Sequence, residues 1–120
     1  MDIKDYQKQA MTTCMATCDN FSYMFLNLVG ELGEFASKIA KSIRKRDGVV
    51  DKNAFFHTSS VLKHTEFYAE LRKEVGDILW QLSGLCDVMG WSLDDVAKEN
   101  LQKLADRKER HVIDGDGDNR

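Results

Sequence analysis

Two short segments of the sequence each carry a pair of acidic residues that could bind a metal ion. "VGELGEF" at 29–35 holds Glu31 and Glu34, and "LRKEVGDILW" at 71–80 holds Glu74 and Asp77. In both segments an apolar residue and a glycine separate the two acids. Carboxylate oxygens are hard ligands that favour Mg²⁺, with Mn²⁺ as an alternative. Because protein-bound Mg²⁺ usually takes further ligands from phosphates, the pattern indicates a phosphate-bearing substrate.

Helical geometry places both acid pairs at the same edge of an apolar stripe. At 100° per residue, Glu31 and Glu34 border a stripe that runs from Phe21 to Ile39. The pair on the later segment borders a similar stripe, from Phe67 to Met89. If the stripes pack together as a core, the four carboxylates meet at one rim. Like charges repel and burial disfavours ionised carboxylates, so such a rim favours a bound cation.

Other interpretations of these acids stay open. They can form ordinary ion pairs along a helix with nearby basic residues, namely Lys38, Arg72 and Lys73. A di-iron site is a weaker alternative, because it calls for Glu-x-x-His segments and no histidine of this chain stands three positions after a glutamate.

The segments that must position the acids are all predicted to be helices. The sequence predicts helices over 3–17, 21–46, 61–89 and 93–110. Asp19 or Asn20 is the expected cap of the second helix and Ser59 or Ser60 that of the third. Ser92 opens a capping box that includes Asp95. Residues 47–60 read as a loop.

Composition agrees with one all-α domain. The chain has 120 residues, 42% of them apolar and 31% charged, and it has no proline, the strongest helix breaker. A net charge of −3 gives no sign of the basic surface that nucleic-acid binding usually requires. There is no apolar run long enough for a membrane span and no apolar N-terminal signal segment. We expect a cytoplasmic protein with a domain over 1–110, a tail over 111–120 and no membrane or nucleic-acid partner.

The acid pairs, taken in order with later motifs, resemble the MazG-like family of all-α nucleoside triphosphate pyrophosphohydrolases. "NLQKLADRKER" is similar to the family's Asn-x-x-Lys-Leu-x-x-Arg segment, which places Asn100, Lys103 and Arg107. The ending "GDGDNR" and the early "DYQKQA" resemble segments of small members. Two features depart from the family: Gly30 stands where a further glutamate is common, with Glu70 as a candidate replacement, and the stretch over 35–73 is long.

The resemblance implies a four-to-five-helix bundle that assembles as a homodimer or homotetramer. It implies hydrolysis of a nucleoside or deoxynucleoside triphosphate to the monophosphate and pyrophosphate, with Mg²⁺ or Mn²⁺. Asn100 would support the metal rim or the sugar, and Lys103 and Arg107 would hold phosphate. The tail would reach an active site, its own or a neighbour's. The metal-binding and catalytic residues would be Glu31, Glu34, Glu74 and Asp77. The alternatives are a non-catalytic metal-binding scaffold or regulatory protein, and a helical oligomer without a metal site.

Overall fold

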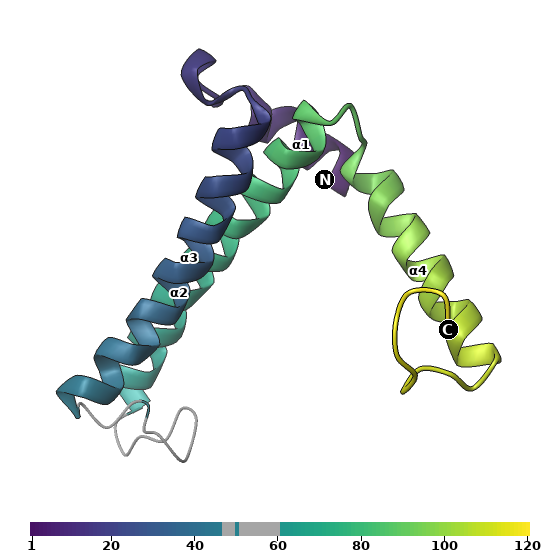
Figure 1. The fold of residues 1–120 in the computed structure, drawn as a ribbon. Helices are drawn as coiled ribbons and strands as arrows, with labels where there is room; N and C mark the ends of the chain where they lie inside the picture. The colour runs from purple at the N-terminus through teal and green to yellow at the C-terminus, as the bar shows by residue number, and fades with distance from the viewer. Residues whose placement is uncertain (47–49, 51–60) are drawn as a thin grey trace.

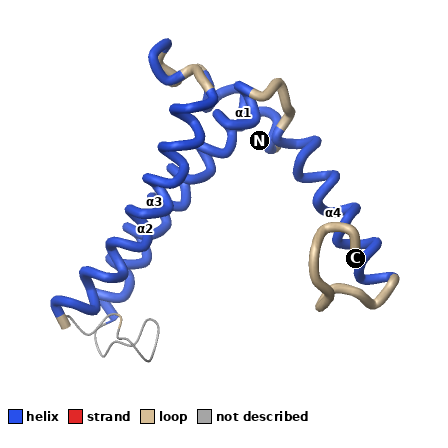
Figure 2. Tube along the Cα trace, viewed as in Figure 1, coloured by secondary structure: helices blue, strands red, loops and turns tan. Residues whose placement is uncertain are grey.

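The computed structural model describes residues 1–46, 50 and 61–120, and it is all-α. Within these residues there are four α-helices and no strand (Figure 2). The elements are α1 Ile3–Met11, a short 3₁₀ helix at Ala16–Cys18, α2 Phe21–Lys45, α3 Val61–Val88 and α4 Leu93–Glu109. The all-α prediction is confirmed. The loop predicted over 47–60, apart from residue 50, and the expected caps Ser59 and Ser60 lie outside the described residues.

Side-chain hydrogen bonds explain where α2 begins and why α1 ends early. The side chain of Asn20 accepts a hydrogen bond of 2.8 Å from the backbone N–H of Tyr23, as predicted for the start of α2. The prediction that the first helix continues to residue 17 was wrong, because α1 ends at Met11. The Thr12 and Thr13 hydroxyls donate back to the carbonyl oxygens of Gln9 and Ala10. Such local bonds offer the backbone an alternative to a continued helix.

The two long helices α2 and α3 lie side by side as an antiparallel pair (Figure 1). Their closest approach involves Met24, which is fully buried, and Gly84. A Cβ atom at position 84 would lie 2.3 Å from the Met24 sulfur, so any larger residue there would force the buried Met24 side chain to shift.

Helix α1 joins α3 to the start of α4. Trp80 on α3 donates its indole N–H to the Ala10 carbonyl at 3.1 Å and to the Thr13 hydroxyl at 2.9 Å. The Gln7 side chain accepts from the backbone N–H of Leu93 at 2.8 Å, at the first residue of α4. Ser92 makes no side-chain capping bond. The capping-box prediction was therefore wrong, because Gln7, far away in the sequence, takes over the cap.

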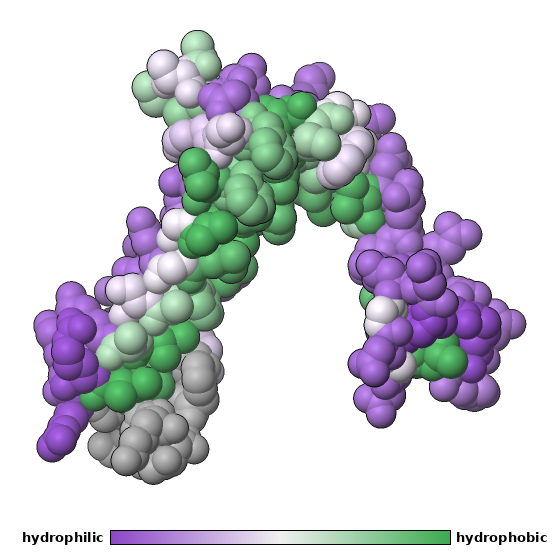
Figure 3. All heavy atoms as spheres, viewed as in Figure 1, coloured by the Kyte–Doolittle hydropathy of each residue, from purple (hydrophilic) through white to green (hydrophobic). Residues whose placement is uncertain are grey.

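Beyond this junction α4 diverges from the α2–α3 pair, so one chain has the outline of an inverted V (Figure 1). The radius of gyration is 18.0 Å, against roughly 14 Å for a compact domain of this length. The predicted core stripes are consequently only half covered. Apolar side chains lie exposed along the concave side of the α2–α3 arm (Figure 3). Those exposed on the long helices include Phe21, Phe25, Leu32, Val75 and Leu82.

Candidate metal site

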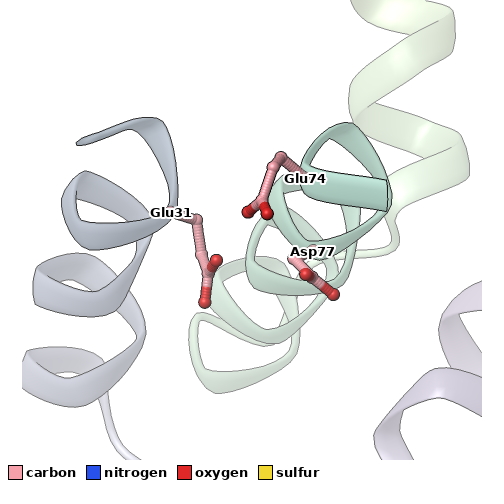
Figure 4. A group of neighbouring side chains, drawn as sticks. All are labelled: Glu31, Glu74 and Asp77. Carbon is pink, nitrogen blue, oxygen red and sulfur yellow. The ribbon is translucent and has the colours of Figure 1, made fainter. Parts of the chain in front are cut away.

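Three of the four predicted metal ligands come together between the two long helices. Glu31 extends from α2, and Glu74 and Asp77 extend from the facing turns of α3 (Figure 4). Each offers one carboxylate oxygen, and these three oxygens lie within 4.8 Å of one another. Both acid segments therefore reach one rim because α2 and α3 pack with their acid-bearing edges on the same side.

The surroundings of this acid group disfavour a negative charge on Glu31. Burial raises the pKa of Glu31, and the negative charges of Glu34, Asp77 and Glu74 raise it further, while a hydrogen bond from Asn27 acts in the opposite direction. Glu74 is only 8% exposed. Within the described residues its Oε2 is a buried oxygen with no hydrogen-bond partner. A buried acceptor without a partner is costly, so this atom calls for a cation or a donor.

The donor set fits a hard divalent cation. All the ligands are carboxylate oxygens, from two rigid helices, and one buried oxygen has its lone pairs free. Lys38 supplies part of the counter-charge, with its Nζ 3.4 Å from Glu74 and 3.6 Å from Glu70. The ion pair with Lys38 proposed from sequence thus coexists with the acid group and leaves Glu74 Oε2 unpaired.

Glu34 lies next to this group without belonging to it. The residue is exposed, and with Glu74, Ser37, Lys38 and Lys41 it lines a small pocket at the edge of the acid group. The negative charge of Glu34 still raises the pKa of Glu31. The side chain is near enough to take part when a ligand is bound, while the tight arrangement involves the other three acids.

Two amide side chains beside the acids were missed by the sequence reasoning. Asn27 donates a hydrogen bond of 3.1 Å to Glu31 and one of 2.9 Å to Gln81 across the helix pair. The signal was present in the spacing, because Asn27 precedes Glu31 by one helical turn and Gln81 follows Asp77 by one turn. What the sequence could not tell is that the two amides contact each other.

The predicted phosphate-binding residues lie apart from the acids. Asn100, Lys103 and Arg107 are on α4, on the other arm of the V (Figure 1). Arg107 is only 5% exposed, because the tail folds back over it. Its guanidinium donates to the Asp118 carbonyl oxygen at 3.0 Å and to the Asp118 carboxylate at 3.1 Å. Lys103 reaches the same carboxylate at 3.4 Å.

The Asp118 carboxylate therefore pairs with Lys103 and Arg107, the two cationic side chains that are expected from the sequence to bind phosphate. The hydrogen bond from Arg107 lowers the pKa of Asp118, and Lys103 lowers it further. The tail is held by Arg120 as well. Its guanidinium donates to the carbonyl oxygens of Val112, Ile113 and Gly117.

In the described parts of the chain none of the helices combines the length and the apolar character needed to cross a bilayer.

Comparison with known proteins agrees with this geometry. The sequence profile of the MazG nucleotide pyrophosphohydrolase domain matches residues 20–112, which include both acid segments and all of α4. A protein of Mycobacterium phage L5, named Gene 37 protein, is 35% identical over 127 aligned positions that span the whole of both chains. No solved structure matches the chain. The chain therefore belongs to the MazG nucleotide pyrophosphohydrolase domain family.

Proposed function

We propose that the protein hydrolyses a nucleoside or deoxynucleoside triphosphate to the monophosphate and pyrophosphate, with Mg²⁺ as cofactor and Mn²⁺ as a substitute. The observation that carries this proposal is the acid group of Glu31, Glu74 and Asp77, whose ligand oxygens lie within 4.8 Å of one another in a chain of the MazG family. The unpartnered oxygen of Glu74 supports a cation at this place.

In the proposed reaction a water molecule attacks the α-phosphorus and the bond to the bridging oxygen of the β-phosphate breaks. Glu31, Glu74 and Asp77 hold the cation, with Glu34 beside them. A bound Mg²⁺ would supply positive charge to the phosphates and make water at this place more acidic. One of the glutamates accepts the proton from the attacking water. The electron pair leaves with pyrophosphate, whose charge Lys103 and Arg107 stabilise, with Asn100 at the sugar or the metal rim.

An apolar cavity next to the acids suits the nucleobase. It has a volume of about 930 Å³, and its lining includes Phe35, Tyr68 and both sequence neighbours of Glu74, namely Lys73 and Val75. Pockets for small ligands are usually apolar with a few polar groups, so this cavity is our candidate for the nucleobase site.

The separation of α4 from the acids leads us to propose self-association, as a homodimer or a homotetramer. Within one chain Lys103 and Arg107 lie on the arm opposite the acids (Figure 1). A second copy packed against the exposed stripe could bring its α4 to the acids of the first. The exposed apolar residues of α2 and α3, with Leu101 and Leu104 on α4, support such an interface.

The first experiment is a product assay with each common nucleoside triphosphate, in Mg²⁺ or in chelator. We expect metal-dependent release of monophosphate and pyrophosphate, and we expect Glu74→Gln to abolish it. Glu66→Gln, which changes an exposed acid of the same helix, is the matched control and should keep full activity. Release of diphosphate and phosphate would contradict the reaction class. Bound Mg²⁺ without turnover on any nucleotide would favour the non-catalytic metal-binding scaffold.

A mixing experiment tests whether the site is shared between copies. Glu74→Gln lacks a metal ligand and Arg107→Ala lacks a phosphate ligand, so each variant alone should be inactive. If acids and α4 come from different chains, unfolding and refolding equal amounts of the two variants together should restore about a quarter of the activity. Failure to regain activity in a mixed assembly of confirmed composition would place both groups in one chain.

A further inference from the structure

A chain of three hydrogen bonds connects the backbone of α2 with the acid group. The Gln81 side chain donates from Nε2 to the Met24 carbonyl oxygen at 3.3 Å. Its Oε1 accepts from Asn27 at 2.9 Å, and Asn27 also donates to Glu31 at 3.1 Å. Gln81 is 2% exposed, so water has little access to compete for these bonds.

The direction of this chain is fixed by the Met24 carbonyl. A carbonyl oxygen can only accept, so the NH₂ group of Gln81 must face Met24 and its oxygen must face Asn27. The Gln81 oxygen also only accepts, so Asn27 must present its own NH₂ group there. That group has two hydrogens, and the second is directed to Glu31. Glu31 therefore meets a donor that is set by the packing of α2 on α3.

We infer that Asn27 and Gln81 are positioning residues, which hold the Glu31 carboxylate in the orientation that a divalent cation requires. The inference rests on the proposed function, since it assumes that the acid group binds the cation. Groups that hydrogen-bond to a ligating carboxylate fix its orientation, and their loss typically weakens metal binding roughly tenfold to a hundredfold. Within the described residues Asn27 gives the one hydrogen bond that Glu31 receives. Gln81 acts through Asn27, because it makes no bond to an acid itself.

The test measures Mn²⁺ affinity from the signal of free Mn²⁺ in electron paramagnetic resonance, and separately the melting temperature of the metal-free protein. Asn27→Leu keeps the approximate shape and removes the donor, and it should raise the Kd for Mn²⁺ at least tenfold. Gln81→Met should raise it less, because Asn27 can still donate to Glu31. Asn20→Ala is the matched control. It removes the cap of the same helix, so it should lower the melting temperature and leave the Kd unchanged.

Different outcomes would overturn the metal site and the positioning role. Wild-type protein that is folded and binds no Mn²⁺ would overturn the metal site, and with it the proposed function. Wild-type protein that binds Mn²⁺ while Asn27→Leu binds it within twofold as tightly would overturn the positioning role and leave the proposed function standing. If Asn27→Leu does not fold, Asn27→Ala is measured in the same way, with the same thresholds.

Discussion

At the scale of single residues, the acid group combines partial burial with mutual repulsion. Glu31 lies in a place that raises its pKa through burial and neighbouring charges, and Glu74 has a buried oxygen without a partner. Both conditions make the metal-free group unfavourable and a bound cation favourable. Metal binding at the proposed site would therefore also stabilise the protein.

Glu31→Gln is expected to change how the stability of the metal-free protein depends on pH. Because the folded state raises the pKa of Glu31, the unfolded chain ionises first as pH rises past the ordinary value of 4.5. The free energy of unfolding contributed by Glu31 thus falls between 4.5 and the raised pKa, and it stays at the lower level above that range. Urea unfolding of both proteins in chelator, from pH 4 to 8, measures this. The two proteins should differ less in Mg²⁺ than in chelator. Parallel curves of unfolding free energy against pH in chelator would show that folding does not raise the pKa of Glu31.

Asp118→Asn is expected to lower the KM for nucleotide by a few-fold. The Asp118 carboxylate now pairs with Lys103 and Arg107, which under the proposed function must bind phosphate. An amide competes less well with phosphate for these cations, because charge-assisted bonds are about twice as strong as neutral ones. Steady-state kinetics measures the change, with Asp116→Asn as a control of equal charge in the same tail. An increase in KM would mean that Asp118 helps to build the site.

At the scale of elements, two contacts between helices far apart in sequence set the arrangement. Gln7 on α1 caps α4 and also donates to the Trp91 carbonyl at 3.0 Å. Gly84 on α3 admits the fully buried Met24 of α2. One contact attaches the arm that bears the cations, and the other allows the close pairing that brings the acids together.

Gln7→Ala is expected to destabilise the protein by about 2 kcal/mol, because it leaves a buried N–H of α4 and a carbonyl without partners. Urea unfolding gives the total effect, and amide hydrogen exchange should show the largest loss of protection in α4. Gln9→Ala, at an exposed position of the same helix, should change stability by less than about 0.5 kcal/mol. Equal effects of the two substitutions would contradict the capping role.

Gly84→Ala is expected to destabilise the helix pair by about 1–3 kcal/mol, since overpacking a filled core outweighs the gain in helix propensity. Gly76→Ala is the matched control on α3, where an added Cβ meets nothing within 4 Å. That variant should gain up to about 1 kcal/mol from helix propensity. Chemical unfolding of both variants measures these changes in stability. A stabilised Gly84→Ala would show that Met24 can move aside.

At the scale of the whole molecule, the exposed apolar stripe and the open outline mean that one chain covers little of its own apolar surface. A radius of gyration of 18.0 Å fits an element of an assembly better than an isolated domain. Paired copies would bury the stripe and also bring α4 of one chain to the acids of another. Stability and catalysis would then depend on the same interface.

Leu32→Lys is expected to shift the assembly toward the monomer. Leu32 is 51% exposed in the middle of the α2 stripe, and a lysine there would place a charge in the apolar interface at a high desolvation cost. Light scattering after gel filtration should give a multiple of 13.7 kDa for the wild type and a smaller mass for the variant. Met15→Lys, a similar change at an exposed residue outside the long helices, should leave the mass unchanged. A wild-type mass of one chain would exclude stable self-association.

The sequence by itself determined the helices and the edge on which the acids lie. These features follow from local periodicity, since residues one turn apart on a helix share a face whatever the rest of the chain does. That is why the start of α2 at its Asn20 cap and the meeting of Glu31, Glu74 and Asp77 could be predicted. The early end of α1 was missed because it depends on hydrogen bonds from two threonine hydroxyls, which periodicity does not reveal.

Only the tertiary structure decided the features that depend on contacts between distant residues. The cap from Gln7 on Leu93, the amide pair of Asn27 and Gln81, and the cover of Arg107 by Asp118 leave no local period in the sequence. The same holds for the direction of α4, which leaves apolar residues such as Leu101 exposed. Helical spacing fixes the face on which a residue lies, whereas the partner of that face depends on how distant parts of the chain pack.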